Sequence, residues 1–94
     1  MIDTLINSGV ALETEADEVM GMKSFNSVNF EEWVSKSILY LENYHKSSAI
    51  TEKAEEGYRK LNSNTNFQYY QFLLGSLKAV KEFEDIQVDD YDNY

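Results

Sequence analysis

The chain has 94 residues and carries 17 acidic against 8 basic side chains, which gives a net charge of −9. It has no Cys, which excludes a disulfide framework and thiolate metal ligands and fits a cytoplasmic setting. No apolar run approaches the ~20 residues of a membrane span. Because Pro is absent and Gly is rare, we expect an all-α domain. The expected fold is a compact bundle of about four helices at residues 1–86, followed by an acidic, flexible tail at residues 87–94.

The first expected helix runs from about Ile2 to Met20. Asp3 occupies the position of an N-cap. The apolar positions follow at steps of three and four residues, as on one face of a helix: Leu5, Gly9, Leu12, Ala16 and Val19. Carboxylates crowd the C-terminal half, where they oppose the helix dipole: Glu13, Glu15, Asp17 and Glu18. That arrangement suggests that the charge serves something other than helix stability.

Residues Gly21 to Ser27 are expected to connect this helix to a second one, from about Phe30 to Asn43. Asn29 is in position to cap the second helix, and Glu32 stands three residues on, as in a capping box. Apolar residues then follow at helical spacing. We expect Trp33 to be the largest buried group of this helix.

A third helix is expected from about Ala49 to Leu61, capped by Ser47 or Ser48. It is the weakest of the set, because Gly57 in its interior costs about 1 kcal/mol relative to Ala. The turn-forming stretch from Asn62 to Asn66 ends it.

The last expected helix, from about Phe67 to Asp85, is apolar on several faces, as is typical of a central, buried helix. Gly75 and Ala79 are expected to let a neighbouring helix approach closely. A second apolar face allows an alternative, in which two copies of the chain form a homodimer through this helix; the face contains Tyr69, Phe72 and Phe83.

Few residues of the chain are candidates for catalysis or for metal binding. His45 is the only His, whereas a nucleophilic triad needs a base beside Ser or Cys and a zinc site needs several His or Cys. We interpret His45 as a polar residue at the end of a surface helix. The run from Asp89 to Asp92 lacks the central Gly and the closing Glu of a calcium loop. We therefore expect no catalytic residue, no metal and no cofactor.

The acidic surface is the remaining candidate for function. Carboxylates three or four residues apart on a helix stand roughly 5–6 Å from one another, which is similar to the phosphate spacing of a nucleic-acid strand. Such a surface repels nucleic acid and anionic membrane but attracts a basic protein surface, such as that of a nucleic-acid-binding enzyme. An open alternative is that the acidity serves solubility alone. The residues expected to bind the partner are Glu13, Glu15, Asp17, Glu18, Glu52, Glu55, Glu56, Asp89, Asp90 and Asp92.

The order of features resembles a helical module that precedes effector domains in bacterial antiviral proteins of the abortive-infection kind. The matching positions are Leu5-Ile6-x-x-Gly9-x-x-Leu12, Phe30-x-x-Trp33, Leu41-Glu42 and Gly75-x-Leu77-Lys78-Ala79-Val80. The resemblance implies a non-catalytic regulatory or assembly element.

In that family an effector domain follows the module, and none follows in these 94 residues. Two hypotheses therefore remain. The chain is an acidic inhibitor of a defence nuclease in phage–host conflict, similar in size and charge to anti-CRISPR proteins and acting as a nucleic-acid mimic. Alternatively, it is a protein-interaction or oligomerisation module of a larger antiviral effector.

Overall fold

The computed structural model describes the backbone of residues 1–92 and the side chains of residues 1–86. The four predicted helices are present, and a two-stranded antiparallel hairpin that was not predicted is added to them. The elements, in chain order, are α1 (Ile2–Leu12), the 3₁₀ turn η1 (Glu13–Glu15), β1 (Asp17–Val19), β2 (Met22–Ser24), α2 (Val28–Tyr44), α3 (Ala49–Arg59) and α4 (Asn66–Asp92).

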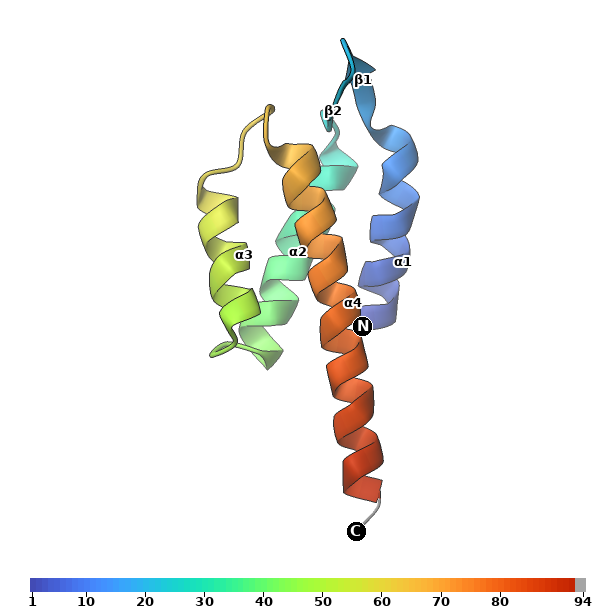
Figure 1. Ribbon diagram of the computed structural model, residues 1–94, viewed down its shortest axis with the longest axis vertical. Coiled ribbons are helices and arrows are strands. Elements are labelled where there is room, and N and C mark those ends of the chain that lie inside the picture. The colour runs from blue at the N-terminus through green and yellow to red at the C-terminus, as the bar shows by residue number, and fades with distance from the viewer. Residues whose placement is uncertain (93–94) are drawn as a thin grey trace.

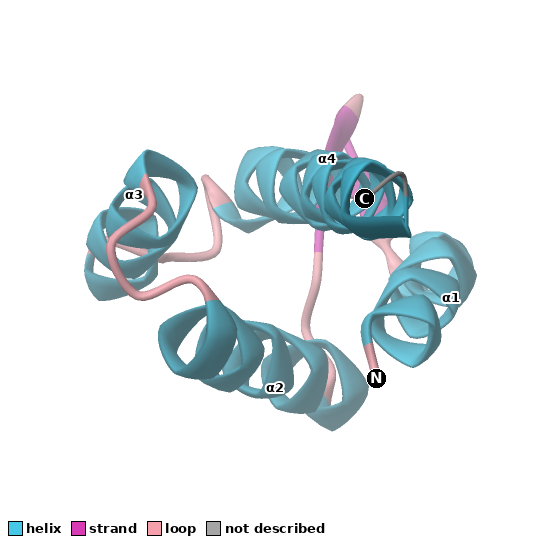
Figure 2. Cartoon of the chain, turned by 90° about the horizontal axis from the view of Figure 1, so that it is seen from below, coloured by secondary structure: helices cyan, strands magenta, loops and turns pink. Residues whose placement is uncertain are grey.

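Helix α4 contacts α1, α2 and α3, and α2 likewise contacts the other three helices, so the two helices share the central role that was predicted for α4 alone. Viewed along the bundle, α2 lies opposite α4, and α1 and α3 lie on either side (Figure 2). The hairpin projects from one end of the bundle, and α4 continues past the other helices at the opposite end (Figure 1). Within the described residues, no helix combines the length and the apolarity needed to cross a membrane.

An aromatic cluster forms the part of the core that supports α1. Trp33 is 3% exposed, which confirms its predicted burial. Its ring N–H donates to the carbonyl of Leu5 at 2.8 Å, and the Tyr70 hydroxyl donates to the carbonyl of Gly9 at 2.6 Å. The Gly9 carbonyl lies in the last turn of α1, where carbonyls lack partners within the helix. Two buried aromatic side chains therefore hold α1 by its backbone as well as by apolar contact.

The prediction that the first helix reaches Met20 is wrong. Regular α-helix ends at Leu12, and Ala16 is already extended, with φ −70° and ψ 132°. The predicted apolar stripe is buried at Leu5, Gly9 and Leu12, whereas Val19 is exposed. The carboxylates from Glu13 onward would be repelled by the negative, C-terminal end of the helix dipole. This repulsion gives a physical reason for the helix to end at Leu12.

Two of the predicted helix caps are also wrong. The side chain of Ser27, not of Asn29, caps α2 by accepting a hydrogen bond from the Phe30 amide at 3.2 Å. Helix α1 begins one residue before Asp3, which lies in its first turn. Ser48 does cap α3, as one of the two predicted alternatives, by accepting from the Ile50 amide at 3.1 Å.

The expected close approach at Gly75 and Ala79 is wrong, because both residues are exposed and a Cβ added to Gly75 would meet nothing within 4 Å. Two other glycines are packed closely against aromatic rings. A Cβ at Gly9 would lie 2.7 Å from the Trp33 ring, and a Cβ at Gly57 would lie 2.7 Å from the Tyr69 ring. Gly57 is therefore required by packing, although it weakens α3 as an isolated helix.

Helix α4 ends at Asp92, beyond the predicted end at Asp85. The predicted tail, residues 87–94, lies outside the described side chains. The prediction of a separate flexible tail therefore stays a prediction.

Candidate functional site

A short hairpin follows α1 and carries most of the first predicted acidic row. Its strands pair in the register Asp17 with Ser24, Glu18 with Lys23, and Val19 with Met22. We call residues 13–24, which comprise η1, β1 and β2, the acidic hairpin. With three residues in each strand, it cannot be stable by itself, because isolated two-stranded hairpins are marginal in water. Its position must therefore depend on the bundle.

The end of the acidic hairpin is fixed by Phe25, the first residue after it. Phe25 is 4% exposed and its ring stacks on Phe30, with 4.5 Å between the ring centroids. Its amide donates to Oδ1 of the buried Asn66 at 2.9 Å, and its carbonyl accepts from Nδ2 of the same residue at 2.8 Å. The residue pattern predicted an ordinary turn at Asn66 and a connection at Phe25. In the structure, the two residues fasten the hairpin to the start of α4.

The tip of the acidic hairpin is apolar and open to solvent. The exposed fractions are 67% for Val19, 97% for Met20 and 61% for Met22. In Figure 1 the tip lies beyond the end of the bundle. These residues were missed as functional candidates, because Val19 and Met20 were assigned to the first helix. The sequence signals that favour the hairpin are Gly21 and the carboxylates that oppose a continued helix.

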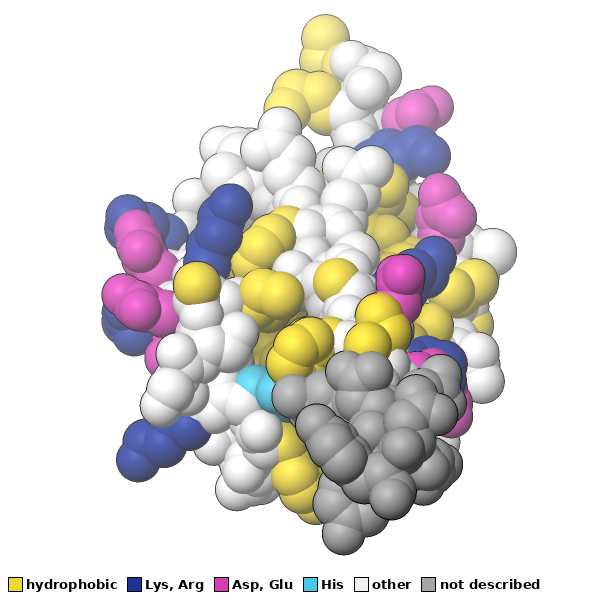
Figure 3. Space-filling model, turned by 60° about the horizontal axis from the view of Figure 1, so that its bottom comes forward, with side chains coloured by type: hydrophobic (Ala, Val, Ile, Leu, Met, Phe, Trp, Pro, Cys, Tyr) yellow, Lys and Arg dark blue, Asp and Glu magenta, His cyan; other side chains and the backbone are white. Residues whose placement is uncertain are grey.

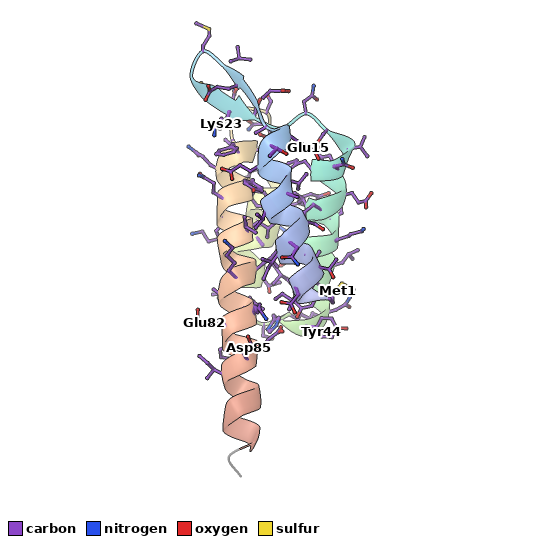
Figure 4. The ribbon with its side chains drawn as sticks, turned by 90° about the vertical axis from the view of Figure 1, so that its right-hand side faces the viewer. Met1, Glu15, Lys23, Tyr44, Glu82 and Asp85 are labelled. Carbon is purple, nitrogen blue, oxygen red and sulfur yellow. The ribbon has the colours of Figure 1, made fainter. Side chains whose placement is uncertain are left out.

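The predicted acidic residues of this region are brought together around the base of that tip. Glu13, Glu15, Asp17 and Glu18 are all exposed. Within the part of the chain whose side chains are described, none of these carboxylates is in a salt bridge. Glu15 accepts long hydrogen bonds, of 3.3 and 3.4 Å, from the Asn29 amide. Figure 4 shows Glu15 where α1 meets the hairpin, and Lys23 on the hairpin itself. Lys23 is the first basic residue of the chain.

The second predicted row, Glu52, Glu55 and Glu56 on α3, has a different environment. The same helix and its C-cap carry Lys53, Arg59 and Lys60. Figure 3 shows acidic and basic side chains interleaved along the side of the molecule where α3 lies. Acidic and basic side chains therefore offset one another on α3, and the row is not a continuous negative surface.

Individual carboxylates of α3 also have partners within the chain. Lys60 Nζ lies 3.0 Å from a Glu56 carboxylate oxygen, and this hydrogen bond holds the pKa of Glu56 below its usual range. Glu55 lies beside Glu42 of α2, and the hydrogen bond between the two carboxyl groups raises the pKa of Glu42. The structure does not bring this row to the acidic hairpin, because α3 and α1 lie on opposite sides of the bundle (Figure 2). The third predicted group, Asp89, Asp90 and Asp92, lies outside the described side chains.

His45 lies at the C-terminal end of α2, as predicted, but its side chain is only 17% exposed and has partners within the chain. Its Nε2 lies 2.6 Å from Oε2 of Glu84, and the Tyr40 hydroxyl donates to the same oxygen at 2.6 Å. Burial raises the pKa of the Tyr40 hydroxyl, and the bond to Glu84 adds to this effect. The three side chains join the end of α2 to α4. Among the residues with described side chains, no group of three or more His, Asp and Glu is placed to hold a metal ion.

A groove of about 650 Å³ runs between α1 and α2. Its floor contains Leu5, Leu12 and Trp33, and small side chains of α1 form one wall, including Thr4, Ser8 and Ala11. Glu15 lines the end near the hairpin, and Met1 and Tyr44 mark the other end (Figure 4). The groove is long and mainly apolar.

Comparison of this chain with protein-family models, with curated proteins and with solved structures finds no match.

Proposed function

We propose that this chain is a non-enzymatic protein-binding protein that uses its acidic hairpin to cover a basic surface on a nucleic-acid-binding partner. The observation that supports this function best is the gathering of Glu13, Glu15, Asp17 and Glu18 at one end of the bundle, all exposed and without a salt bridge within the described side chains. Charge complementarity between such a surface and a basic one accelerates encounter and selects partners.

The rigidity of the attachment supports the proposal. Exposed ion pairs each contribute little, because ordering long side chains costs entropy and salt screens the attraction. A carboxylate set held in place by a fixed backbone loses less entropy when a partner binds. The bonds between Asn66 and the Phe25 backbone provide that fixed base, since they tie the hairpin to α4.

The biological setting that we propose is phage–host conflict, with the chain as an inhibitor of a defence nuclease in the manner of anti-CRISPR proteins that mimic nucleic acid. This part of the proposal comes from the sequence resemblance to antiviral modules and from the size and charge of the chain. The acidic hairpin would provide the means of inhibition, because it would compete with nucleic acid for the basic groove of the nuclease.

A binding panel tests the proposed function. The chain would be immobilised and exposed to purified DNA- and RNA-binding enzymes, including defence nucleases, at ionic strengths from 50 to 500 mM. At least one enzyme should bind, with an affinity that falls as salt rises because screening shortens the reach of the charges. Added nucleic acid should displace the chain from it. Affinity that is flat with salt, or no binding to any member of the panel, would contradict the proposal.

A second candidate function is self-association through α4. Phe83 and Ile86 are each 52% exposed on the part of α4 near its projecting end, which favours a contact there. Tyr69 is not available for this contact, since it is 7% exposed and its hydroxyl donates to the Ala54 carbonyl of α3 at 2.7 Å. Self-association would strengthen with salt, because the two copies carry charge of the same sign. Sedimentation velocity at low and high salt distinguishes the two functions, and a monomer at all concentrations contradicts the second.

A further inference from the structure

Met20 has a backbone conformation that its side chain does not favour. Met20 and Gly21 form the two-residue loop of the hairpin, with φ of 53° and 80°. Positive φ at both positions is typical of a type I′ turn, which prefers Asn, Asp or Gly because other residues are strained there. Within the described residues, Met20 is the one residue other than Gly with positive φ. Gly21 meets the requirement of the turn, and Met20 does not.

Burial within the chain does not account for a methionine at this position. Its side chain is 97% exposed, and its neighbours Val19 and Met22 are also largely exposed. An Asn at position 20 would relieve the strain and remove exposed apolar surface. Strained backbone and exposed apolar side chains are both costs to the free chain, and such costs concentrate at sites of binding.

We propose that Val19, Met20 and Met22 form an anchor that inserts into an apolar pocket on the partner protein, and that Lys and Arg side chains surround this pocket. The inference rests on the proposed function and specifies the shape and chemistry of the surface that the partner presents. The apolar tip would fill the dry centre of the interface, and the carboxylates at its base would meet the basic rim. This division into an apolar centre and a polar rim is usual at protein interfaces, where Met is enriched. Met also adapts its shape to a pocket, because it is unbranched and flexible.

Charge complementarity selects this occupant over two others. Asp17 and Glu18 lie within a few residues of the tip, and Glu13 and Glu15 lie at its base. One base, Lys23, stands opposite Glu18, so the hairpin keeps a net negative charge. An anionic membrane would repel these carboxylates, and a second copy of the chain would present the same charges to them. On a protein partner, an apolar pocket accommodates the tip while the basic rim around the pocket attracts the carboxylates.

The test uses an enzyme that binds the full chain in the panel described above, and compares three variants. Met20→Asn should weaken binding by about 10- to 100-fold, because a methionine side chain is no longer buried. The salt dependence should stay as in the parent, since no charge changes. The melting temperature should not fall, because Asn tolerates positive φ. Met20→Leu should bind within a few-fold of the parent. Ile86→Asn is the matched control at the opposite end of the molecule and should bind like the parent.

The outcomes separate this inference from the proposed function. If Met20→Asn binds as tightly as the parent while binding remains salt-dependent, the anchor is wrong and the acidic surface stands. If Ile86→Asn weakens binding and Met20→Asn does not, the contact lies on α4 and both proposals are wrong. Both are also wrong if no enzyme of the panel binds the parent. Binding of the parent, but not of Met20→Asn, to neutral phosphatidylcholine vesicles would identify a lipid-inserting tip and overturn the protein pocket.

Discussion

The acidic hairpin and helix α3 carry carboxylate rows that look alike in the sequence and differ in the structure. On α3, Glu52, Glu55 and Glu56 alternate with basic side chains, and Lys60 pairs with Glu56 at 3.0 Å. The acidic hairpin carries four exposed carboxylates and a single base, Lys23, which lies opposite Glu18 in the strand register and over the Phe67 ring. The comparison shows that the spacing of acids alone does not identify a binding surface. What matters is whether bases are interleaved with the acids and whether a fixed backbone holds the acids.

Loss of Trp33 is expected to have the largest effect on stability. It should destabilise α1, which leads into the acidic hairpin, more than α3. Trp33→Ala removes a buried ring beside Gly9 and the hydrogen bond to the Leu5 carbonyl, so the free energy of unfolding should fall by about 3–5 kcal/mol. Urea denaturation measures the loss. Hydrogen exchange should show α1 losing more protection than α3. A variant as stable as the parent would mean that this contact does not support the core.

Asn66 tests the attachment of the acidic hairpin directly. Asn66→Ala leaves the buried amide and carbonyl of Phe25 without their partners, and should cost about 2–4 kcal/mol. Binding to the partner should weaken as well, because the carboxylates lose their fixed base. Asn64→Ala, at an exposed position of the same turn, is the control and should change stability by less than about 0.5 kcal/mol. Equal stability of the two variants would contradict the role given to Asn66.

Three glycine substitutions compare the packing of α1, α3 and α4. Gly9→Ala and Gly57→Ala should each destabilise the protein by about 1–3 kcal/mol, because the new Cβ would lie 2.7 Å from an aromatic ring. Gly75→Ala is the matched control and should stabilise by up to about 1 kcal/mol, since it gains helix propensity in open space. Thermal unfolding measures all three. A gain of stability at Gly57 would show that α3 does not depend on its contact with Tyr69.

Substitution in the pair formed by Glu42 and Glu55 is expected to have the smallest effect on stability. The pH dependence of this effect arises at the contact between α2 and α3 and does not involve the acidic hairpin. The folded-state pKa of Glu42 is raised, so this interaction stabilises the fold at pH values below the unfolded pKa and is lost as pH rises through the folded pKa. Once Glu42 has lost its proton, its hydrogen bond to Glu55 is lost and the neighbouring side chains repel each other. Glu55→Gln should therefore raise the melting temperature by about 1–3 °C at pH 7, with no gain near pH 4. Glu52→Gln is the control, and an equal gain in that variant would contradict the pairing.

Sequence periodicity predicted the helices well where a single apolar face meets the core. Leu5, Gly9 and Leu12 are buried in α1 as expected, and so is Trp33 in α2. Ser48 was correctly included among the cap candidates for α3. These features depend on residues within a few positions of one another, so local patterns are sufficient to predict them.

The acidic hairpin could not be predicted from the same patterns, because its stability comes from distant residues. The apolar spacing continues through Ala16 to Val19, as it would in a longer helix. The carboxylates from Glu13 onward are a local signal against the longer helix, but the bonds that fix the hairpin to the bundle join Phe25 and Asn66, which are 41 positions apart. Predicting the candidate site was only partly successful, since its carboxylates were named in advance and its apolar tip was not.

The most direct test of the central claim is a matched removal of charge from the two rows. One variant combines Glu13→Gln, Asp17→Asn and Glu18→Gln, and the other combines Glu52→Gln, Glu55→Gln and Glu56→Gln. Affinity for a partner enzyme would be measured from low to high salt. The hairpin variant should bind about 10- to 100-fold more weakly at low salt, with a shallower salt dependence, while the α3 variant stays within about threefold of the parent. Equal losses in both variants, or a larger loss in the α3 variant, would contradict the assignment of the binding surface to the acidic hairpin.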